Sequence, residues 1–434
     1  MTGSIIIGLV GIIASLSFMT FAVYKNWSVI YTSVVCVLII SITSGLNLVE
    51  VFTGTFTNGV GSFAAPNLLI FVAGAILGKL FDESGAAWRI GNTVVTKMGN
   101  KWSLLGYVIV TSLLTWGGIS AFVVYFVLLP LSRPIFKETG TPWYLWPGIT
   151  LMGIVPPELI WPGGLQVHNI LPTNVLGTNL MAAPVMSIAM AVVFYLFCAG
   201  YLYLEYKSIK RTPWKQNSLP PEVTDANDEA LQEKAPGLLV SIIPIVICLG
   251  SINVLGLEPI FGLTLGVVAA IILFYKSVSG KLLECMNIGT DTGIKPLVGV
   301  ACIVGIAQVV AVTDAFGMIK EVLLSFSSSS KAATALSVVA STNIVALVCG
   351  SASGAITMIL EMFSDTWLSA GLSPEWIHRT VCAAAGGFDT VPWNTGVIVA
   401  LTVSGLDHKR AYKPIFWLSL VAPIVAAMAS VFFV

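Results

Sequence analysis

The chain of 434 residues is strongly apolar, with 56% hydrophobic residues, only 10% charged residues and a mean hydropathy of +0.92. Soluble proteins carry about 25% charged residues, so the composition excludes an ordinary soluble domain. The 21 basic and 21 acidic residues balance, which leaves neither a basic stripe for nucleic acid nor an acidic tail. Apolar runs near the roughly 20 residues needed to cross a bilayer recur along the chain and predict an all-α, polytopic membrane protein surrounded by lipid.

Taken in chain order, the apolar runs predict about ten crossings. The spans are 4–24, 28–47, 64–81, 144–160 with a broken continuation, 180–204, 236–254, 257–275, 296–318, 377–404, which is also broken, and 414–433. Two further stretches, 103–136 and 333–363, each consist of two short apolar pieces around a Gly/Ser break. Each piece is too short for about 30 Å of hydrocarbon, so we expect two re-entrant hairpins. The first run lacks a basic start and a cleavage site, which favours a retained helix over a signal peptide.

The hydrophilic segment 207–235 divides the chain and predicts a cytoplasmic linker between a first repeat, 1–206, and a second, 236–434. We place the N-terminus outside and let each hairpin return to the side it entered. All but three of the 21 Lys and Arg residues then lie inside, as the positive-inside rule requires. We therefore expect a multi-pass protein of the inner or plasma membrane with both termini extracytoplasmic. A plain twelve-helix topology also places the basic stretch 207–215 inside, so it stays open.

Comparing the chain with itself predicts an internal repeat. Motifs of the first half recur in the same order about 230 residues later, at Gly59 and Gly289, Pro66 and Pro296, Ser120 and Ser353, and Asn169 and Asn394. Five crossings in each half would insert the halves in opposite orientations. Inverted repeats with helices broken at matching positions near the midplane are the mark of secondary transporters that work by alternating access.

The breaks supply the candidate binding residues. A hairpin tip exposes the N-terminus of a half-helix, whose free N–H groups and positive dipole end attract anions. The first tip contains Gly118 and Ser120, and the second contains Ser351 and Ser353. The two longer breaks add further polar groups, since Asn and Thr side chains donate or accept hydrogen bonds and His relays protons near neutral pH. These residues are His168 and Asn169 in the first half and Asn394 and Thr395 in the second. Small-residue helix packing and a structural role for His168 are the alternatives.

Acidic residues within membrane spans are costly and often functional. The candidates for proton coupling are Asp82, Glu83, Asp291, Asp314, Glu361 and Asp389. Asp82 and Glu83 fit an interfacial ion pair with Lys79. Asp389 lies inside a break and Glu361 lies within the second hairpin, so we favour these two as proton carriers. Coupling to Na⁺ through Ser, Thr and Asn oxygens and hairpin carbonyls is the alternative.

Enzyme motifs are absent from the sequence. It contains no H-E-x-x-H, no Walker A loop, no haem-type pair of His residues and no metal-ligand cluster, and "GGFD" (386–389) has no Tyr-Asp partner of the kind that intramembrane aspartyl proteases use. A channel would require rings of carbonyls or charges. The sequence therefore predicts neither an enzyme nor a bound cofactor, and the only expected ligands are a small carboxylate and its coupling ion.

Two motifs resemble the gluconate permease family. They are "AGAILGKLFDESGAAWRIGNTVV" (73–95) and "HRTVCAAAGGFDTVPWNTGVIVALTVSGLDHKRAY" (378–412). The resemblance spans nearly the whole chain. It implies a fold of the ion transporter superfamily, with inverted repeats and hairpins, and proton-coupled uptake of a small organic acid such as a hydroxy acid or sugar acid. Relatives in the superfamily are often dimers, so a homodimer is one arrangement that the resemblance allows.

The resemblance departs from the family pattern at Trp393. The family usually reads Leu-Pro-His-Asn-Gly, whereas this chain has Val391-Pro392-Trp393-Asn394-Thr395-Gly396. A large apolar ring with a single donor thus replaces an imidazole. The stretch "WPGGLQVHNILPTNVLGT" (161–178) resembles the branch associated with short hydroxy acids such as 3-hydroxybutyrate. Together these features favour a small, sparsely hydroxylated monocarboxylate over gluconate.

Overall fold

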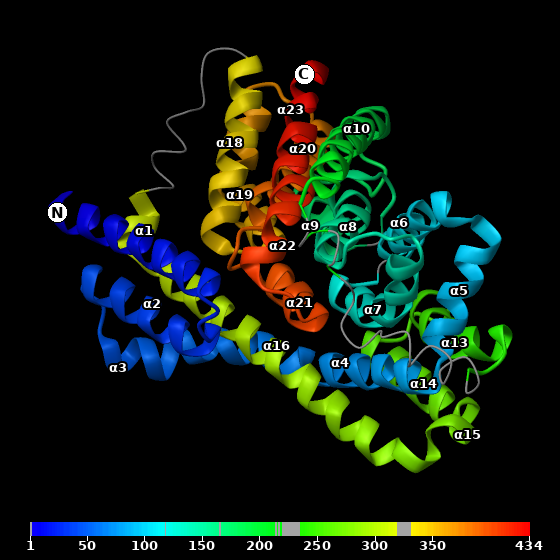
Figure 1. Ribbon diagram of the computed structural model, residues 1–434. Coiled ribbons are helices and arrows are strands. Elements are labelled where there is room, and N and C mark those ends of the chain that lie inside the picture. Colours follow the sequence, from blue (N-terminus) through cyan, green and yellow to red (C-terminus); the bar gives the residue numbers. More distant parts are fainter. Residues whose placement is uncertain are drawn as a thin grey trace.

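The computed structural model describes residues 2–117, 119–164, 166–212, 215, 218, 235–318 and 331–434. All regular elements in these residues are helices, as expected for a polytopic membrane protein (Figure 1). Gly118 and most of the predicted linker 207–235 lie outside the described residues. The division of the chain into two repeats and a linker therefore stays a prediction.

The first half of the chain begins with two apolar helices and ends with a long one. Its elements are α1 (Thr2–Tyr24), α2 (Val29–Thr43), α3 (Leu48–Glu50), η1 (Val51–Thr55), α4 (Phe56–Ser84), α5 (Ala86–Met98), α6 (Asn100–Trp116), α7 (Ala121–Glu138), η2 (Trp143–Leu145), α8 (Trp146–Val155), η3 (Pro156–Ile160), α9 (Val167–Leu176) and α10 (Pro184–Ile209).

The second half follows the same order. Its elements are α13 (Leu238–Asn253), α14 (Pro259–Leu273), α15 (Tyr275–Val278), η4 (Ser279–Lys281), α16 (Leu282–Ala311), α18 (Lys331–Cys349), α19 (Ala352–Ser369), α20 (Pro374–Asp389), α21 (Thr395–Ser404), α22 (His408–Ile415), η5 (Phe416–Val421), α23 (Ala422–Ala429) and η6 (Ser430–Phe433). In both halves a helix pair precedes a long helix, a two-helix hairpin, a broken helix and a final apolar helix. Helix α5 lies between the long helix and the hairpin of the first half, where the second half is described only in part.

Several helices are suited to a bilayer. Within the described residues, five are long and apolar enough to cross it by length and composition: Gly3–Tyr24, Leu48–Ser84, Pro184–Ile209, Tyr275–Ala311 and His408–Phe433. Shorter apolar helices of 10–17 residues accompany them. Their outward surfaces carry many exposed Ile, Leu, Val and Phe side chains, which suit contact with lipid tails. The chain is therefore a multi-pass membrane protein, and the count of ten crossings stays a prediction.

Helices α4 and α16, with the short helical segments that precede them, are longer than the hydropathy of the sequence predicts. The expected spans 64–81 and 296–318 correspond to continuous helical stretches, Leu48–Ser84 and Tyr275–Ala311, each of 37 residues. The helical turns that lie before the predicted spans contain polar residues such as Thr53, Asn58 and Thr290. These residues lower the local hydropathy. Hydropathy therefore placed both helix starts too late.

Helices α4 and α16 pack along each other in antiparallel fashion, and glycines permit the contact. A Cβ on Gly59 would lie 2.8 Å from Gly305 Cα, and a Cβ on Gly289 would lie 2.7 Å from Ile76 Cα. A Cβ on Gly293 would lie 2.6 Å from the Phe71 carbonyl oxygen. Contacts on α4 thus move forward along the chain as those on α16 move backward. The polar end of each helix packs against the apolar end of the other, which is why both extend beyond their apolar cores.

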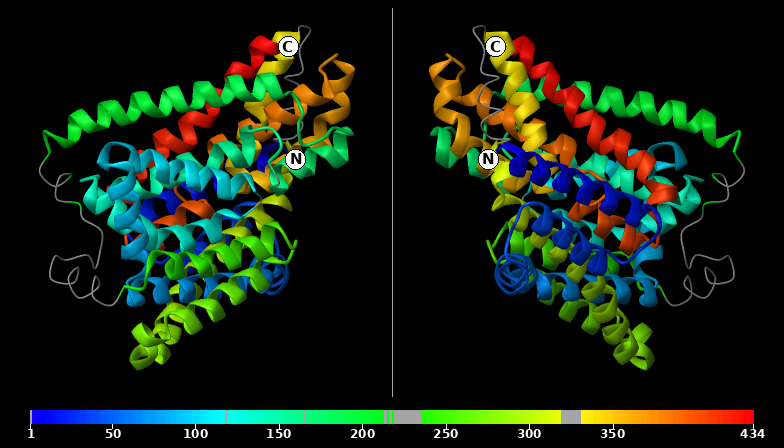
Figure 2. Two further views of the ribbon diagram at one scale, coloured as in Figure 1. Left: turned by 90° about the vertical axis from the view of Figure 1, so that its right-hand side faces the viewer. Right: turned by 90° about the vertical axis from the view of Figure 1, so that its left-hand side faces the viewer.

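The long helices separate two groups of helices. Figure 1 shows α4 and α16 along one side of the molecule, with α1, α2 and α3 at one end and α13, α14 and α15 at the other. Helix α2 contacts α16, and α14 contacts α4. The helices α6–α10 and α18–α23 gather on the opposite side, as the two views in Figure 2 also show.

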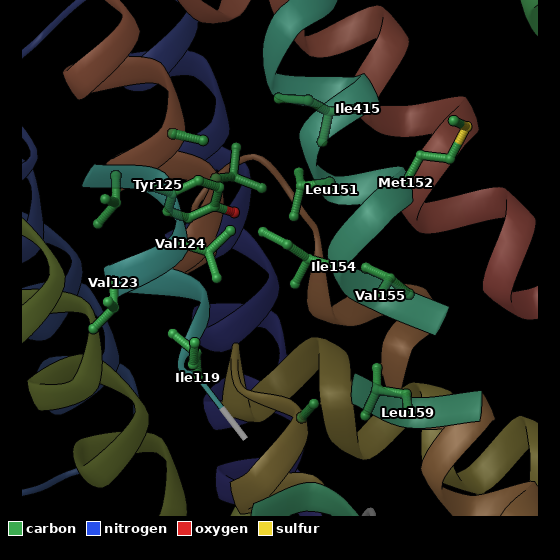
Figure 3. Packing of buried hydrophobic residues seen from close by; sticks show 14 of the residues in the cluster. Ile119, Val123, Val124, Tyr125, Leu151, Met152, Ile154, Val155, Leu159 and Ile415 are labelled. Atoms are coloured by element: carbon green, nitrogen blue, oxygen red, sulfur yellow. The ribbon is translucent and has the colours of Figure 1, made fainter. Parts of the chain in front are cut away.

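Two helix hairpins belong to this second group. Helix α6 packs on α7 across residues 117–120, and α18 packs on α19 across residues 350 and 351. These pairs match the predicted stretches 103–136 and 333–363, although the return of each hairpin to its side of the membrane stays a prediction. Figure 3 shows the apolar packing between α7, which contributes Val124 and Tyr125, and α8, which contributes Leu151 and Ile154. This core holds the first hairpin against the first broken helix.

A cavity lined by four helix N-termini

A cavity of about 600 Å³ lies between the hairpins and the broken helices. Its lining includes the first turns of α7, α9, α19 and α21, each of which begins directly after a break in the chain. Two of these helices come from each half. A helix leaves its first four N–H groups without intrahelical partners, so four sets of such donors surround one space.

Polar side chains begin three of these helices. Ser120 starts α7 and accepts a hydrogen bond from the Val123 amide at 3.5 Å. Ser351 starts α19 and accepts from the Gly354 amide, while its hydroxyl also lies 3.1 Å from that of Ser353. Asn394 starts α21 and accepts from the Val397 amide at 3.0 Å. Ser and Asn are favoured at helix N-caps because they satisfy one orphan donor.

A side-chain amide in each half ties the broken helix to the hairpin tip. Gln166, which precedes α9, donates through Nε2 to the carbonyls of Thr115 and Ile119 at 2.6 and 2.8 Å. Asn394, which precedes α21, donates through Nδ2 to the Gly350 carbonyl at 3.2 Å. Ile119 and Gly350 each lie directly before the N-cap serine of their hairpin. The two halves therefore make the same contact with residues at corresponding positions.

The electrostatics of the cavity combine positive helix ends with two carboxyl groups. Among the described residues that line it, none is Lys or Arg. The fixed positive potential therefore comes from helix dipoles and N–H groups, an arrangement that binds carboxylates and phosphates in many proteins. Tyr125 and Thr390 also line the cavity, and their buried hydroxyls make no hydrogen bond to any described residue.

The two carboxyl groups are those of Asp389 and Glu158. Asp389 accepts from Asn394 Nδ2 at 3.0 Å and from the backbone amide of Ala352, the first residue of α19. A Glu158 carboxylate oxygen lies 3.2 Å from Nδ1 of His168, in the first turn of α9. Each acid thus lies against the N-terminal turn of a half-helix, where a negative charge is stabilised.

The structure brings most of the predicted site residues to this cavity. Those lining it are Ser120, His168, Ser351, Ser353, Asp389, Asn394 and Thr395. Gly118 lies outside the described residues. Asn169 and Glu361 are not part of the lining: Asn169 is buried behind it, and Glu361 is exposed on α19. Gln166 and Asn394 bond the residues directly before Ser120 and Ser351, and the predicted pairing of the two halves stays a prediction.

Asn169 instead supports the first break from behind. Its Nδ2 donates to the carbonyls of Gly164 and Leu180 at 2.8 and 3.2 Å, and its Oδ1 contacts His378 Nε2 at 2.9 Å. The neighbouring Arg379 is buried and donates to three backbone carbonyls of the same region, at Trp161, Leu180 and Ala182. Polar groups of the second half therefore hold the non-helical backbone of the first.

Glu158, Gln166 and Tyr125 are cavity residues that the sequence did not single out. Glu158 directly follows Pro156 and Pro157 and lies five residues before Gly163, within an otherwise apolar run. An acid beside two prolines in an apolar span was the available signal. Gln166 and Tyr125 carry no comparable signal, because amides and tyrosines at helix ends usually have other partners. Only the fold shows that they face this space.

An apolar helical fold with an internal cavity between broken helices is typical of solute transporters of the membrane. The model of the GntP family permeases matches residues 4–361, and the chain belongs to this family.

The similar curated proteins are also transporters. The uncharacterized transporter YxjC of Bacillus subtilis (strain 168) is 27% identical over 472 aligned positions, which cover 97% of this chain and 98% of that protein. The Gnt-II system L-idonate transporter of Escherichia coli (strain K12) is 32% identical over 31% of each chain. The high-affinity gluconate transporter of the same strain is 22% identical over 67% of this chain and 64% of its own.

Proposed function

We propose that the protein imports a small monocarboxylate together with protons by alternating access, with the substrate bound in the cavity between the hairpins. The observation that carries this proposal is the convergence of four helix N-termini on one space. Substrate carboxylate oxygens would accept from the free N–H groups of α7, α9, α19 and α21, and from the hydroxyls of Ser120 and Ser353. Polar substituents of the substrate would bond to Tyr125, Thr390 and Thr395.

The charges of the cavity support proton coupling. Unlike charges in a low-dielectric site attract strongly and like charges repel, so an anion is excluded by ionised carboxylates in the same space. Since no described Lys or Arg lines the cavity, a mobile cation must neutralise its acids, and we propose that this cation is the proton. Asp389 also occupies the N–H group of Ala352 at the start of α19. Protonation of Asp389 would weaken that bond and leave the donor to the substrate.

Several contacts support two inverted repeats as the basis of alternating access. Helices α4 and α16 are antiparallel. When Gly59 is aligned with Gly289, Gly305 of α16 corresponds to Ala75 of α4. The contact of Gly59 with Gly305 then corresponds, within one residue, to the contact of Gly289 with Ile76. The contacts of Gln166 and Asn394 with their hairpin tips are similarly related. An odd number of crossings in each half would produce this arrangement, with both termini extracytoplasmic in the cell membrane.

The proposed substrate class is a monocarboxylate with few hydroxyl groups. The similar proteins that carry substrate names are transporters of gluconate and L-idonate, which are sugar acids. This chain differs from the family pattern at Trp393, which packs near Gly350 beside the second hairpin tip. Trp393 lies outside the cavity lining and beside Gly350, so it would act on substrate choice through the position of the second hairpin tip. A short hydroxy acid such as 3-hydroxybutyrate satisfies the N-terminal donors equally well.

The test uses purified protein in Na⁺-free proteoliposomes, with labelled 3-hydroxybutyrate and labelled gluconate as separate probes. We expect saturable counterflow of at least one of them and concentrative uptake when a pH gradient, acid outside, is imposed. Asp389→Asn should lower this accumulation while counterflow persists. Glu258→Gln, at an exposed helix start away from the cavity, is the matched control and should behave as wild type. Uptake driven by a Na⁺ gradient and unaffected by pH would replace proton coupling with sodium coupling.

A further inference from the structure

Glu158 is an acid in the cavity that the coupling scheme above does not use. It lies in η3, and 15% of its side chain is exposed, toward the cavity that it helps to line. A carboxyl group at such depth is costly unless it has a function or a permanent partner. Its contact is the His168 ring at 3.2 Å, and no Lys or Arg is paired with it among the described residues. No permanent cation therefore explains its presence.

Glu158 and Asp389 both lie near the end of a helix that precedes a break, one in each half of the chain. Each acid lies in the last turns of the helix that precedes a break, five to eight residues before the amide that bonds the hairpin tip, Gln166 or Asn394. The half-helices that follow, α9 and α21, both end at a glycine in the left-handed conformation, Gly177 and Gly405. The cavity thus receives one carboxyl group from each half, each from the end of a helix before a break.

The surroundings of Glu158 contain other ionisable groups, but none holds it in a fixed charge state. From α9 it faces His168, and from α20 it faces Asp389, whose charge interacts with its own. The guanidinium of Arg379, also on α20, is occupied by backbone carbonyls. Tyr125 on α7 interacts electrostatically with both carboxyl groups. The hydroxyl of Tyr107 on α6 lies at hydrogen-bond distance from Thr150, and that of Tyr195 on α10 from Ser112.

We propose that Glu158 is a second proton-binding group, so that one monocarboxylate anion enters with two protons, one on Glu158 and one on Asp389. This inference rests on the proposed function. Both acids would be protonated from the outside before the anion occupies the cavity, and both would release their protons inside after it leaves. His168 acts as a positioning residue that orients the Glu158 carboxyl toward the cavity. Each cycle then moves one net positive charge inward, because two protons accompany one negative charge.

The charge movement makes the proposal testable through the membrane potential. Moving one elementary charge through 100 mV changes the limiting accumulation ratio by about 50-fold. Wild-type protein in Na⁺-free proteoliposomes, with the potential set by K⁺ and valinomycin, should therefore accumulate the labelled probe more strongly by about this factor when the inside is negative. Glu158→Gln and Asp389→Asn should each abolish the effect of potential while keeping uptake driven by the pH gradient. The double variant should retain only counterflow.

Counterflow, which needs no driving force, shows in every variant that the protein is folded and binds the probe. His168→Gln should keep the response to potential, with a changed KM, because the proton resides on Glu158. Potential dependence that disappears in His168→Gln and persists in Glu158→Gln would overturn the assignment. Wild-type uptake that responds to pH but not to potential would overturn the two-proton stoichiometry and leave the proposed function intact. Absence of counterflow for both labelled acids would overturn the proposed function as well.

Discussion

Replacing Asn394 with Ala tests whether this residue contributes to substrate transport or only to the packing of the helices. The side chain is 4% exposed and makes three hydrogen bonds, to the Val397 amide, the Gly350 carbonyl and the Asp389 carboxyl group. The loss of an N-cap costs about 1 kcal/mol, and each of the two donor bonds contributes about 1 kcal/mol or more. We therefore expect Asn394→Ala to lower the free energy of unfolding by about 3 kcal/mol.

Asn394→Ala should also impair transport by the protein that does fold. The hairpin tip would no longer be tied to α21, and one of the two contacts that orient Asp389 would disappear. We expect kcat/KM for uptake to fall by at least about tenfold, since 1.4 kcal/mol of lost binding corresponds to a factor of ten. Initial rates in proteoliposomes, normalised to the amount of folded protein from size-exclusion chromatography, measure this quantity.

Asn394→Asp provides the matched comparison. Aspartate keeps the N-cap acceptor for Val397 but lacks the donor for Gly350 and Asp389, and it adds a charge beside the Asp389 carboxyl group. Its thermal midpoint should exceed that of the alanine variant at pH values that protonate the acids, while its uptake should be no better. Wild-type uptake by Asn394→Ala would refute the role of this residue in the site.

The remaining predictions concern Ser353 at the second hairpin tip, the α4–α16 contact and the buried Arg379. Ser353→Ala should reduce uptake strongly without lowering the amount of protein in the membrane, measured by quantitative blotting. Gly293→Ala should lower the thermal midpoint by several degrees, because its Cβ would meet backbone of α4, whereas Gly61→Ala, with open space around it, should leave the midpoint unchanged or slightly raised. Arg379→Lys should lower both uptake and stability, because an ammonium group cannot bond the same three carbonyls as the planar guanidinium. Equal thermal midpoints for this variant and the wild type would contradict the prediction.

The class of protein and the places where its helices break could be read from the sequence. Long apolar runs force membrane insertion, and Gly, Pro and Ser interrupt helices wherever they occur together, so the breaks near Ser120, Ser351 and Asn394 are local properties. The matching motifs of the two halves follow from the same local chemistry. This is why seven of the predicted site residues line one cavity in the folded chain.

Which polar side chain of a break faces the cavity is decided by tertiary packing. Gln166 and Asn169 are less than one helical turn apart, yet Gln166 bonds the hairpin tip and Asn169 bonds the backbone behind it. Glu158 enters the site only because η3 packs against α9 and α20, a contact between distant parts of the chain. Likewise, the polar turns of α4 and α16 are helical because each packs on the apolar part of the other. The periodicity of a sequence contains no information about which distant segment a helix will pack against. These features could therefore be learned only from the tertiary structure.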